Sequence, residues 1–190
     1  MIPLITYTPR LTLIAASRAL LTAELHKPHY FPILLGAAMP ADWPPGEYDL
    51  AAMRYFLEQL TAGGRTAAGW YGWYALLKAT DTTPTTLVGA GGFLGPPNAA
   101  GQAEIGYSIA ADWRGQGLGT ELVAGLLHQA AQTGMVQQLA AHTQPDNLPS
   151  QQVLVHNGFE PAGLAADGLL RFERAVVPAV PTDAEGRPLW

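Results

Sequence analysis

The 190-residue chain contains no cysteine. This absence excludes disulfide bonds, a thiolate nucleophile and metal sites built on cysteine. Charged residues are also few, at 13% of the chain, and the formal net charge is −5. An acidic balance argues against nucleic acid as a partner, because nucleic-acid phosphates select basic surfaces. The same balance is compatible with a cationic or amine substrate.

Long hydrophobic runs are missing as well. No run of about eighteen apolar residues occurs, so no transmembrane helix and no membrane partner are expected. The N-terminus lacks the basic and apolar regions of a signal peptide, which favours a cytoplasmic protein. The spacing of the histidines fits no metal-ligand pattern, so no metal is expected. The length suits one domain with a core that is stable unaided.

Glycine, by contrast, is abundant, and Gly115, Gly117 and Gly119 fall in one turn. The turn follows an apolar strand predicted over residues 102–109 and precedes a helical pattern over residues 118–131. Glycine lets the backbone approach a ligand closely, and the first N–H groups of a helix have no internal partner. The turn therefore predicts a phosphate cradle. Its spacing matches neither the dinucleotide pattern nor the P-loop pattern, and a turn that only joins strand and helix is the alternative.

The other elements follow from periodicity and turn residues. Strands are expected at residues 10–16, 70–77, 86–94, 136–142, 159–164 and 169–175. Helices are expected at residues 17–26, 29–37, 49–60 and 149–156. Short hairpin links imply antiparallel pairs, and the crossover helix implies one parallel pair. The sequence thus predicts an α+β fold with a mixed, mostly antiparallel central sheet of six to seven strands flanked by helices. A domain over residues 8–175 and a loose, proline-containing tail over residues 176–190 are expected.

The order of elements and two motifs together resemble the GNAT superfamily of acyl-CoA-dependent N-acyltransferases. The family signature Arg/Gln-x-x-Gly-x-Gly/Ala opens the central helix, and a second motif, Asn-x-x-Ser/Ala, opens a short helix that ends in Gly-Phe. The matching residues are Arg114, Gly117 and Gly119 for the first motif and Asn147, Ser150, Gly158 and Phe159 for the second. The opening segment, residues 8–13, resembles the branch that acetylates the N-termini of ribosomal proteins.

This resemblance implies acetyl-CoA as co-substrate, without a metal, in a monomer or homodimer. The CoA pyrophosphate is expected on the backbone amides of Arg114, Gly115, Gln116, Gly117, Leu118, Gly119 and Thr120. The pantetheine arm is expected along the strand that ends at Ile109, which splays from its neighbour in the family and would leave backbone groups of Ile109 and Ala111 free. In the family, Asn147 reaches CoA or an ordered water and Ser150 lies near the thiol. Simple helix capping is the alternative for both.

Glu104 is the candidate general base, because acyl transfer needs a neutral amine and hence a proton acceptor. Alternation along the strand puts Glu104, Gly106 and Ser108 on one face and leaves space for a substrate. A solvated or structurally paired carboxylate is the alternative. His142, at the end of the neighbouring strand, lies beside the expected acyl site, and a structural histidine is the alternative there.

The general acid is left open by the sequence. Many relatives carry a Tyr four residues after the Ser150 position to protonate the thiolate, and this chain has Leu154 there. Ser150, Tyr107 or water are the candidates that remain. The missing phenol also supports a second reading of the whole chain, as a non-catalytic acyl-CoA-binding module.

One wall of the acceptor groove is expected from the predicted helices at residues 18–37 and 49–60, with the Trp43-Pro-Pro connector between them. We therefore predict that Trp43 and Glu104 contact the acceptor. Acidic residues around the connector, Asp42, Glu47 and Asp49, would attract a cationic amine. The expected acceptor is a peptide or protein N-terminus or a small amine.

Overall fold

The computed structural model describes residues 4–179. Its eight strands are β1 Ile5–Tyr7, β2 Leu11–Ala15, β3 Trp73–Leu77, β4 Thr86–Phe93, β5 Gln102–Ile109, β6 Gln138–Thr143, β7 Glu160–Leu164 and β8 Leu170–Ala175. Its helices are α1 Arg18–His26, α2 Phe31–Leu35, α3 Leu50–Gly63, α4 Leu118–Thr133 and α5 Leu148–His156, with short 3₁₀ turns η1 Gly64–Thr66 and η2 Ala111–Trp113.

The strands form one sheet in the order β1-β2-β3-β4-β5-β6-β8-β7. Every neighbouring pair is antiparallel except β5 and β6, which are joined through α4 and run parallel. The predicted mixed sheet is confirmed, with eight strands in place of six to seven. The unpredicted strand is β1, which has only three residues and buries only Thr6, too short a segment for alternation to mark it.

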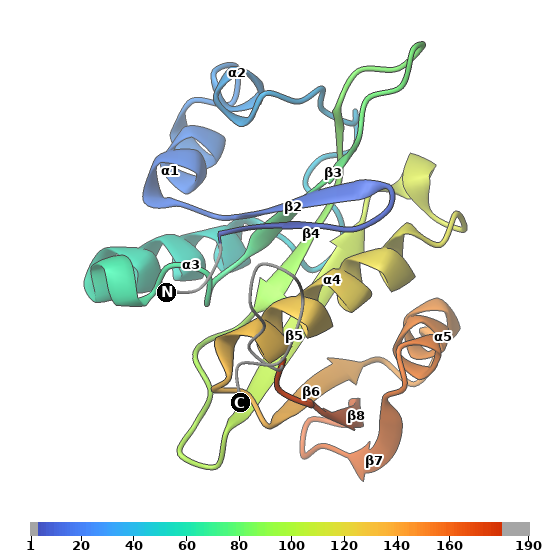
Figure 1. The fold of residues 1–190 in the computed structure, drawn as a ribbon. Coiled ribbons are helices and arrows are strands. Elements are labelled where there is room, and N and C mark those ends of the chain that lie inside the picture. Colours follow the sequence, from blue (N-terminus) through green and yellow to red (C-terminus); the bar gives the residue numbers. More distant parts are fainter. Residues whose placement is uncertain (1–3, 180–190) are drawn as a thin grey trace, which may run out of the picture.

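Helices cover both faces of the sheet (Figure 1). Leu13 and Ile14 of β2 point to opposite faces, because side chains alternate along a strand. Leu13 lies against Gly125 of α4. Ile14 shares its face with its register partner Tyr74, whose ring contacts Phe31 of α2. Hence α4 covers one face, and the layer of α1, α2 and α3 covers the other.

The aromatic stretch before and within β3 belongs to the core. Trp70, Tyr71, Trp73 and Tyr74 are all buried. Large rings contribute much apolar area to a core, so this strand anchors the α1–α3 layer on the sheet.

Residues 176–179, the start of the predicted tail, pack onto the fold. The N–H of Val176 donates to the carbonyl of Gln137, and that of Ala179 donates to Ala131. The rest of the predicted tail lies outside the described residues. Within residues 4–179, no helix is long and apolar enough to cross a membrane.

Candidate active site

The glycine turn forms an open cradle at the N-terminus of α4. Gly115 and Gly117 have φ angles of 71° and 76°, a left-handed conformation that strongly favours glycine. Gly117 is the N-cap of α4, and no side chain caps that helix. A Cβ at Gly115 would meet nothing within 4 Å. Unsatisfied N–H groups in open space at a helix N-terminus fit phosphate oxygens.

An ion pair between Arg10 and Glu121 contacts the backbone of this cradle. Glu121, in the first turn of α4, accepts hydrogen bonds from the Thr8 hydroxyl at 2.6 Å and from the Arg10 backbone N–H at 2.6 Å. The Arg10 guanidinium lies 2.7 Å from Glu121 and also donates to the carbonyl of Gln116 at 2.9 Å. Partial burial opposes ionisation, but these hydrogen bonds and the Arg10 charge outweigh it and lower the pKa of Glu121. Arg10 thus offsets a negative charge beside the expected phosphate site, a role that the sequence analysis missed.

Strands β5 and β6 part where the sheet meets the cradle. Their pairing ends at Ile105 and Ala141, although β5 continues to Ile109. The N–H of Ala110 and the carbonyl of Glu104 bond toward β4, so alternation turns the backbone groups of Tyr107 and Ile109 toward the opening. We call this opening the β5–β6 fork.

Two backbone groups expected to be free at the fork are occupied. The carbonyl of Ile109 accepts a hydrogen bond from Nε of Arg114 at 2.9 Å. The N–H of Ala111 donates to the carboxylate of Asp42 at 2.6 Å. The expectation that these backbone groups are free is therefore wrong for this structure. The Arg114 side chain bonds to the end of β5 and does not reach toward the expected phosphate position. Neither contact could be predicted from residue type or spacing, because each depends on how a side chain folds back.

Glu104 forms a pair with His142 at the fork. Its Oε1 lies 2.8 Å from Nδ1 of His142. The register puts Glu104 beside Ala140, so His142, two residues further along β6, lies on the same face. The side chains are 41% and 17% exposed, which leaves the carboxylate accessible and the imidazole largely covered.

Tyr107 and Ser150 form a second pair, on the other face of β5. The Tyr107 hydroxyl lies 3.0 Å from both the carbonyl and Oγ of Ser150. Burial raises the pKa of Tyr107 to about 12, although the hydrogen bond with Ser150 works against the shift. Leu154, at the position on α5 where many relatives carry a Tyr, is fully buried in the core. The phenol that contacts Ser150 comes instead from Tyr107 on β5. Asn147 accepts the Ser150 N–H at 3.2 Å, which is the capping role named as its alternative.

A cavity of about 220 Å³ opens over β4 and β5 on the α3 side of the sheet. Glycines at 91, 92 and 106 line it together with Ser108, opposite Tyr48, Ala52 and Phe56. Residues 39–48, which we call the connector, supply Glu47 and Tyr48 to its wall. Neither Trp43 nor Glu104 is among the lining residues. The Trp43 ring packs on Tyr48 with centroids 5.6 Å apart, so Trp43 lies behind the predicted wall. Glu104 shares its face of β5 with the lining residues Gly106 and Ser108.

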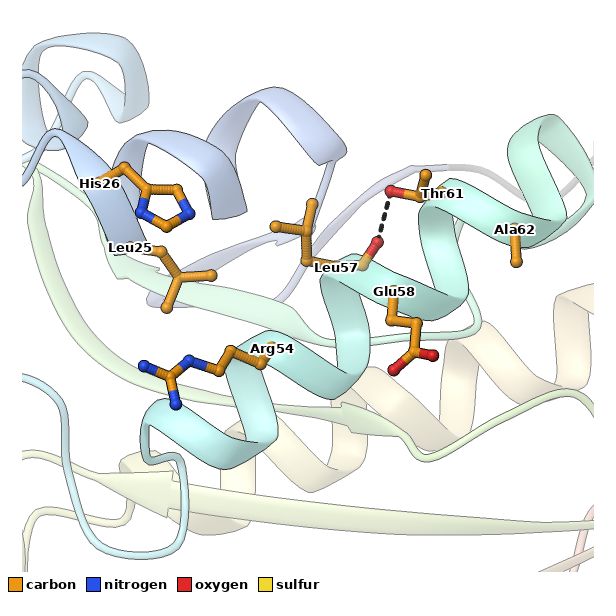
Figure 2. A pocket seen from close by; sticks show the side chains of 7 residues that line it. All are labelled: Leu25, His26, Arg54, Leu57, Glu58, Thr61 and Ala62. Carbon is orange, nitrogen blue, oxygen red and sulfur yellow. Dashed lines mark hydrogen bonds between the residues drawn. The ribbon is translucent and has the colours of Figure 1, made fainter.

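A second hollow, a groove of about 410 Å³, lies between α1 and α3. Figure 2 shows Leu25 and His26 of α1 above a row of side chains along α3, from Arg54 to Ala62. Most of its lining residues lie on the two helices predicted to form one wall of the acceptor groove. None of them comes from β5 or β6, so the groove shares no lining residue with the fork.

Comparisons with known proteins identify the family. Residues 19–160 match the family model described as an acetyltransferase (GNAT) domain. The chain is 31% identical over 152 residues to an uncharacterized N-acetyltransferase, YjdG, of Bacillus subtilis (strain 168), a match that covers 80% of this chain and 87% of that protein. The chain belongs to the GNAT acetyltransferase family.

Ribosomal-protein acetyltransferases are also among its relatives. The chain is 35% identical over 66 residues to the [ribosomal protein uS5]-alanine N-acetyltransferase of Escherichia coli (strain K12), covering 35% of this chain and 34% of that protein. Its fold is similar to RimL, a ribosomal L7/L12 alpha-N-protein acetyltransferase solved with coenzyme A, with a TM-score of 0.60, 20% identity and coverage of 92% and 97%. Mycobacterium smegmatis RimJ, solved with CoA-disulfide, gives a TM-score of 0.57 at 21% identity, covering 87% of this chain and 81% of that one.

Proposed function

We propose that this protein transfers an acetyl group directly from acetyl-CoA to a primary amine, on a peptide or protein N-terminus or on a small molecule. One observation carries the proposal: the Glu104–His142 pair and the Tyr107–Ser150 pair flank the β5–β6 fork on opposite faces of β5. A proton acceptor and a hydrogen-bond donor thus lie on either side of the opening. The acceptor can take off the proton that the amine must lose to attack, and the donor can stabilise the thiolate that leaves.

The fork and the cradle have the chemistry to hold acetyl-CoA. Backbone amides from Gly115 to Thr120 would take its phosphates, whereas the amide of Arg114, also expected there, already donates to the carbonyl of Ala111. The fork edge at Tyr107 would pair with the amide-bearing pantetheine arm. Arg114 and Asp42 would have to give up Ile109 and Ala111 if the arm used those groups. When bound, acetyl-CoA supplies an activated acetyl group and a thiolate as leaving group.

Glu104 would accept the proton of the amine. Its Oε1 bonds to His142, whereas no hydrogen bond to its Oε2 from residues 4–179 is present. The exposed oxygen is therefore available to an ammonium group or to a water between them. His142 would fix the carboxylate in this orientation.

Tyr107 would stabilise the departing thiolate by hydrogen bonding. A pKa of about 12 lies about 3.5 units above the roughly 8.5 of an ordinary thiol. Full proton transfer from the phenol to the thiolate would thus be uphill by about 5 kcal/mol. The proton that completes the thiol would come from solvent, with the phenol and the Ser150 hydroxyl orienting the sulfur.

The cavity over β4 and β5 would receive the acceptor. Its glycine-lined floor leaves room beside the fork, and Glu47 gives its wall a negative charge that attracts an ammonium group. The names of the relatives, which act on alanine or on the alpha-amino group of ribosomal proteins, support a protein N-terminus as the first substrate class to test.

Release of free CoA thiol would test this proposal. The panel should contain short peptides that begin with Ala or Ser, the same peptides with a blocked N-terminus, and small mono- and polyamines. We expect release with at least one free amine and none with the blocked peptides. Tight binding of acetyl-CoA by calorimetry, without release for any amine, would instead support the non-catalytic acyl-CoA-binding module.

A further inference from the structure

Glu24 of α1 is a largely buried carboxylate that the proposed chemistry does not use. Its Oε1 accepts the indole N–H of Trp43 at 2.7 Å, and its Oε2 accepts the hydroxyls of Tyr48 at 2.8 Å and Tyr74 at 2.6 Å. The two hydroxyls are 3.3 Å apart. One carboxylate thus joins α1, two points of the connector and strand β3.

A buried carboxylate is not expected to stabilise the fold more than an apolar side chain would. Burial raises the pKa of Glu24, and the hydrogen bonds from Tyr74, Trp43 and Tyr48 offset only part of that cost. An apolar side chain of similar volume commonly packs as well as a buried charge or better. What hydrogen bonds to a charged group do supply is a fixed direction for each donor, here for one indole and two phenols.

The two donors on the connector determine where the cavity wall stands. Tyr48 lines the cavity, and Trp43 supports its ring from behind. The other side of the connector touches β5. At Gly46 a Cβ would lie 3.0 Å from Oγ of Ser108, and Asp42 holds the N–H of Ala111. The wall is thus held to β5 on one side and to Glu24 on the other.

We propose that Glu24 is a positioning residue for the acceptor: it holds Trp43 and Tyr48 so that the connector forms the wall of the acceptor cavity, and it thereby sets the KM for the amine. The inference rests on the proposed function, because KM has a meaning only if an amine is acetylated. The position of the connector, however, is measurable without turnover.

The test compares Glu24→Leu, which keeps bulk but accepts no hydrogen bond, with Glu24→Gln, which keeps one acceptor oxygen. Trp43→Phe removes a connector donor and leaves the carboxylate in place, so it reports on the same link if Glu24→Leu does not fold. Glu58→Leu is the matched control, because it makes the same change on α3 in the groove of Figure 2. For each variant we would measure acceptor KM and kcat, acetyl-CoA affinity by calorimetry, and hydrogen exchange of residues 39–48.

We expect Glu24→Leu to raise acceptor KM by about tenfold, the equivalent of one lost hydrogen bond to a charged group. Acetyl-CoA affinity should stay within about twofold, and exchange of the connector should accelerate. Trp43→Phe should shift the same readouts by less, and Glu24→Gln should restore most of the KM. Glu58→Leu should change neither KM nor exchange in the connector.

Three results would overturn the inference. The first is unchanged exchange of residues 39–48 in both Glu24→Leu and Trp43→Phe. The second is an equal rise in the acceptor KM and in the Kd for acetyl-CoA, which would mean that the fold as a whole had loosened. A KM rise confined to Glu58→Leu would move the acceptor to the α1–α3 groove and would also contradict it. If the wild-type chain acetylates no amine, the proposed function fails, and the exchange data still decide whether Glu24 positions the connector.

Discussion

Removing Glu121 should destabilise the protein more than removing the arginine with which it pairs. Four donors converge on this carboxylate: the Thr8 hydroxyl, the backbone N–H groups of Arg10 and Leu11, and Nε of Arg10. Arg10→Met deletes only the last of them and leaves the backbone donors in place. Glu121→Ala deletes the acceptor of all four.

The structure sets the size of the two effects. The Arg10 side chain is 48% exposed, so the loss of its ion pair should cost about 1 kcal/mol or less. The Leu11 N–H keeps a second acceptor, the Thr8 hydroxyl, and that hydroxyl keeps the carbonyl of Leu11. Glu121→Ala therefore leaves two donors without a protein partner, the backbone N–H and the Nε of Arg10. At about 0.5–1.5 kcal/mol for each net hydrogen bond, its cost should be about 1–3 kcal/mol.

Urea unfolding of both variants and of the wild type would test this order. Because the pKa of Glu121 is lowered, its contribution is present above the ordinary carboxyl pKa and is lost as pH falls through the lowered value. The difference in the free energy of unfolding between wild type and Glu121→Ala should therefore become smaller in acid. An Arg10→Met loss equal to or larger than that of Glu121→Ala would refute the reasoning.

Three further predictions concern the cradle, the phenol and the buried carboxylate. Gly117→Ala should raise the acetyl-CoA Kd at least about tenfold by calorimetry, because relief of roughly 1–2 kcal/mol of left-handed strain turns the cradle amides away from the phosphate position. Gly134→Ala, with a similar φ at the far end of α4, should cost similar stability without weakening binding. Equal binding losses in the two variants would contradict the site. Tyr107→Phe should lower kcat by about tenfold or less without moving the pH profile near neutrality, because a phenol with a pKa of about 12 stays protonated there; a shifted basic limb would show proton transfer instead. Because the pKa of Glu24 is raised, its ionisation costs stability as pH rises through that value. Glu24→Gln should therefore gain stability relative to wild type from acid to neutral pH. A difference in the free energy of unfolding in urea that does not change with pH would contradict this.

Most elements of the fold could be predicted from local signals in the sequence. Ser17 and Asp49 begin their helices as N-caps, and residues 102–109 form the predicted strand. Side chain and backbone lie within a few residues of each other in such elements, so residue type and periodicity largely determine them. The cradle belongs to this group, since its glycines and the helix that follows are contiguous.

The contacts around the site depend on long-range geometry. Glu24 reaches Tyr74 across 50 positions of the chain, and Glu121 reaches Thr8 across 113. The Glu104–His142 pair requires the register of a parallel strand pair, which no local pattern specifies. A carboxylate and an imidazole were each predicted near the acyl site, but their contact could be known only from the folded chain.

The dependence of turnover on Glu104 tests the central claim most directly. We would compare kcat for CoA release by wild type and Glu104→Gln across neutral and alkaline pH, with acetyl-CoA affinity measured on the same samples. The account predicts a kcat loss of about 10²-fold near neutrality that shrinks as pH rises, because the amine then needs less help to lose its proton, while acetyl-CoA affinity is unchanged. Wild-type turnover by Glu104→Gln at neutral pH would remove Glu104 from the chemistry and contradict the account.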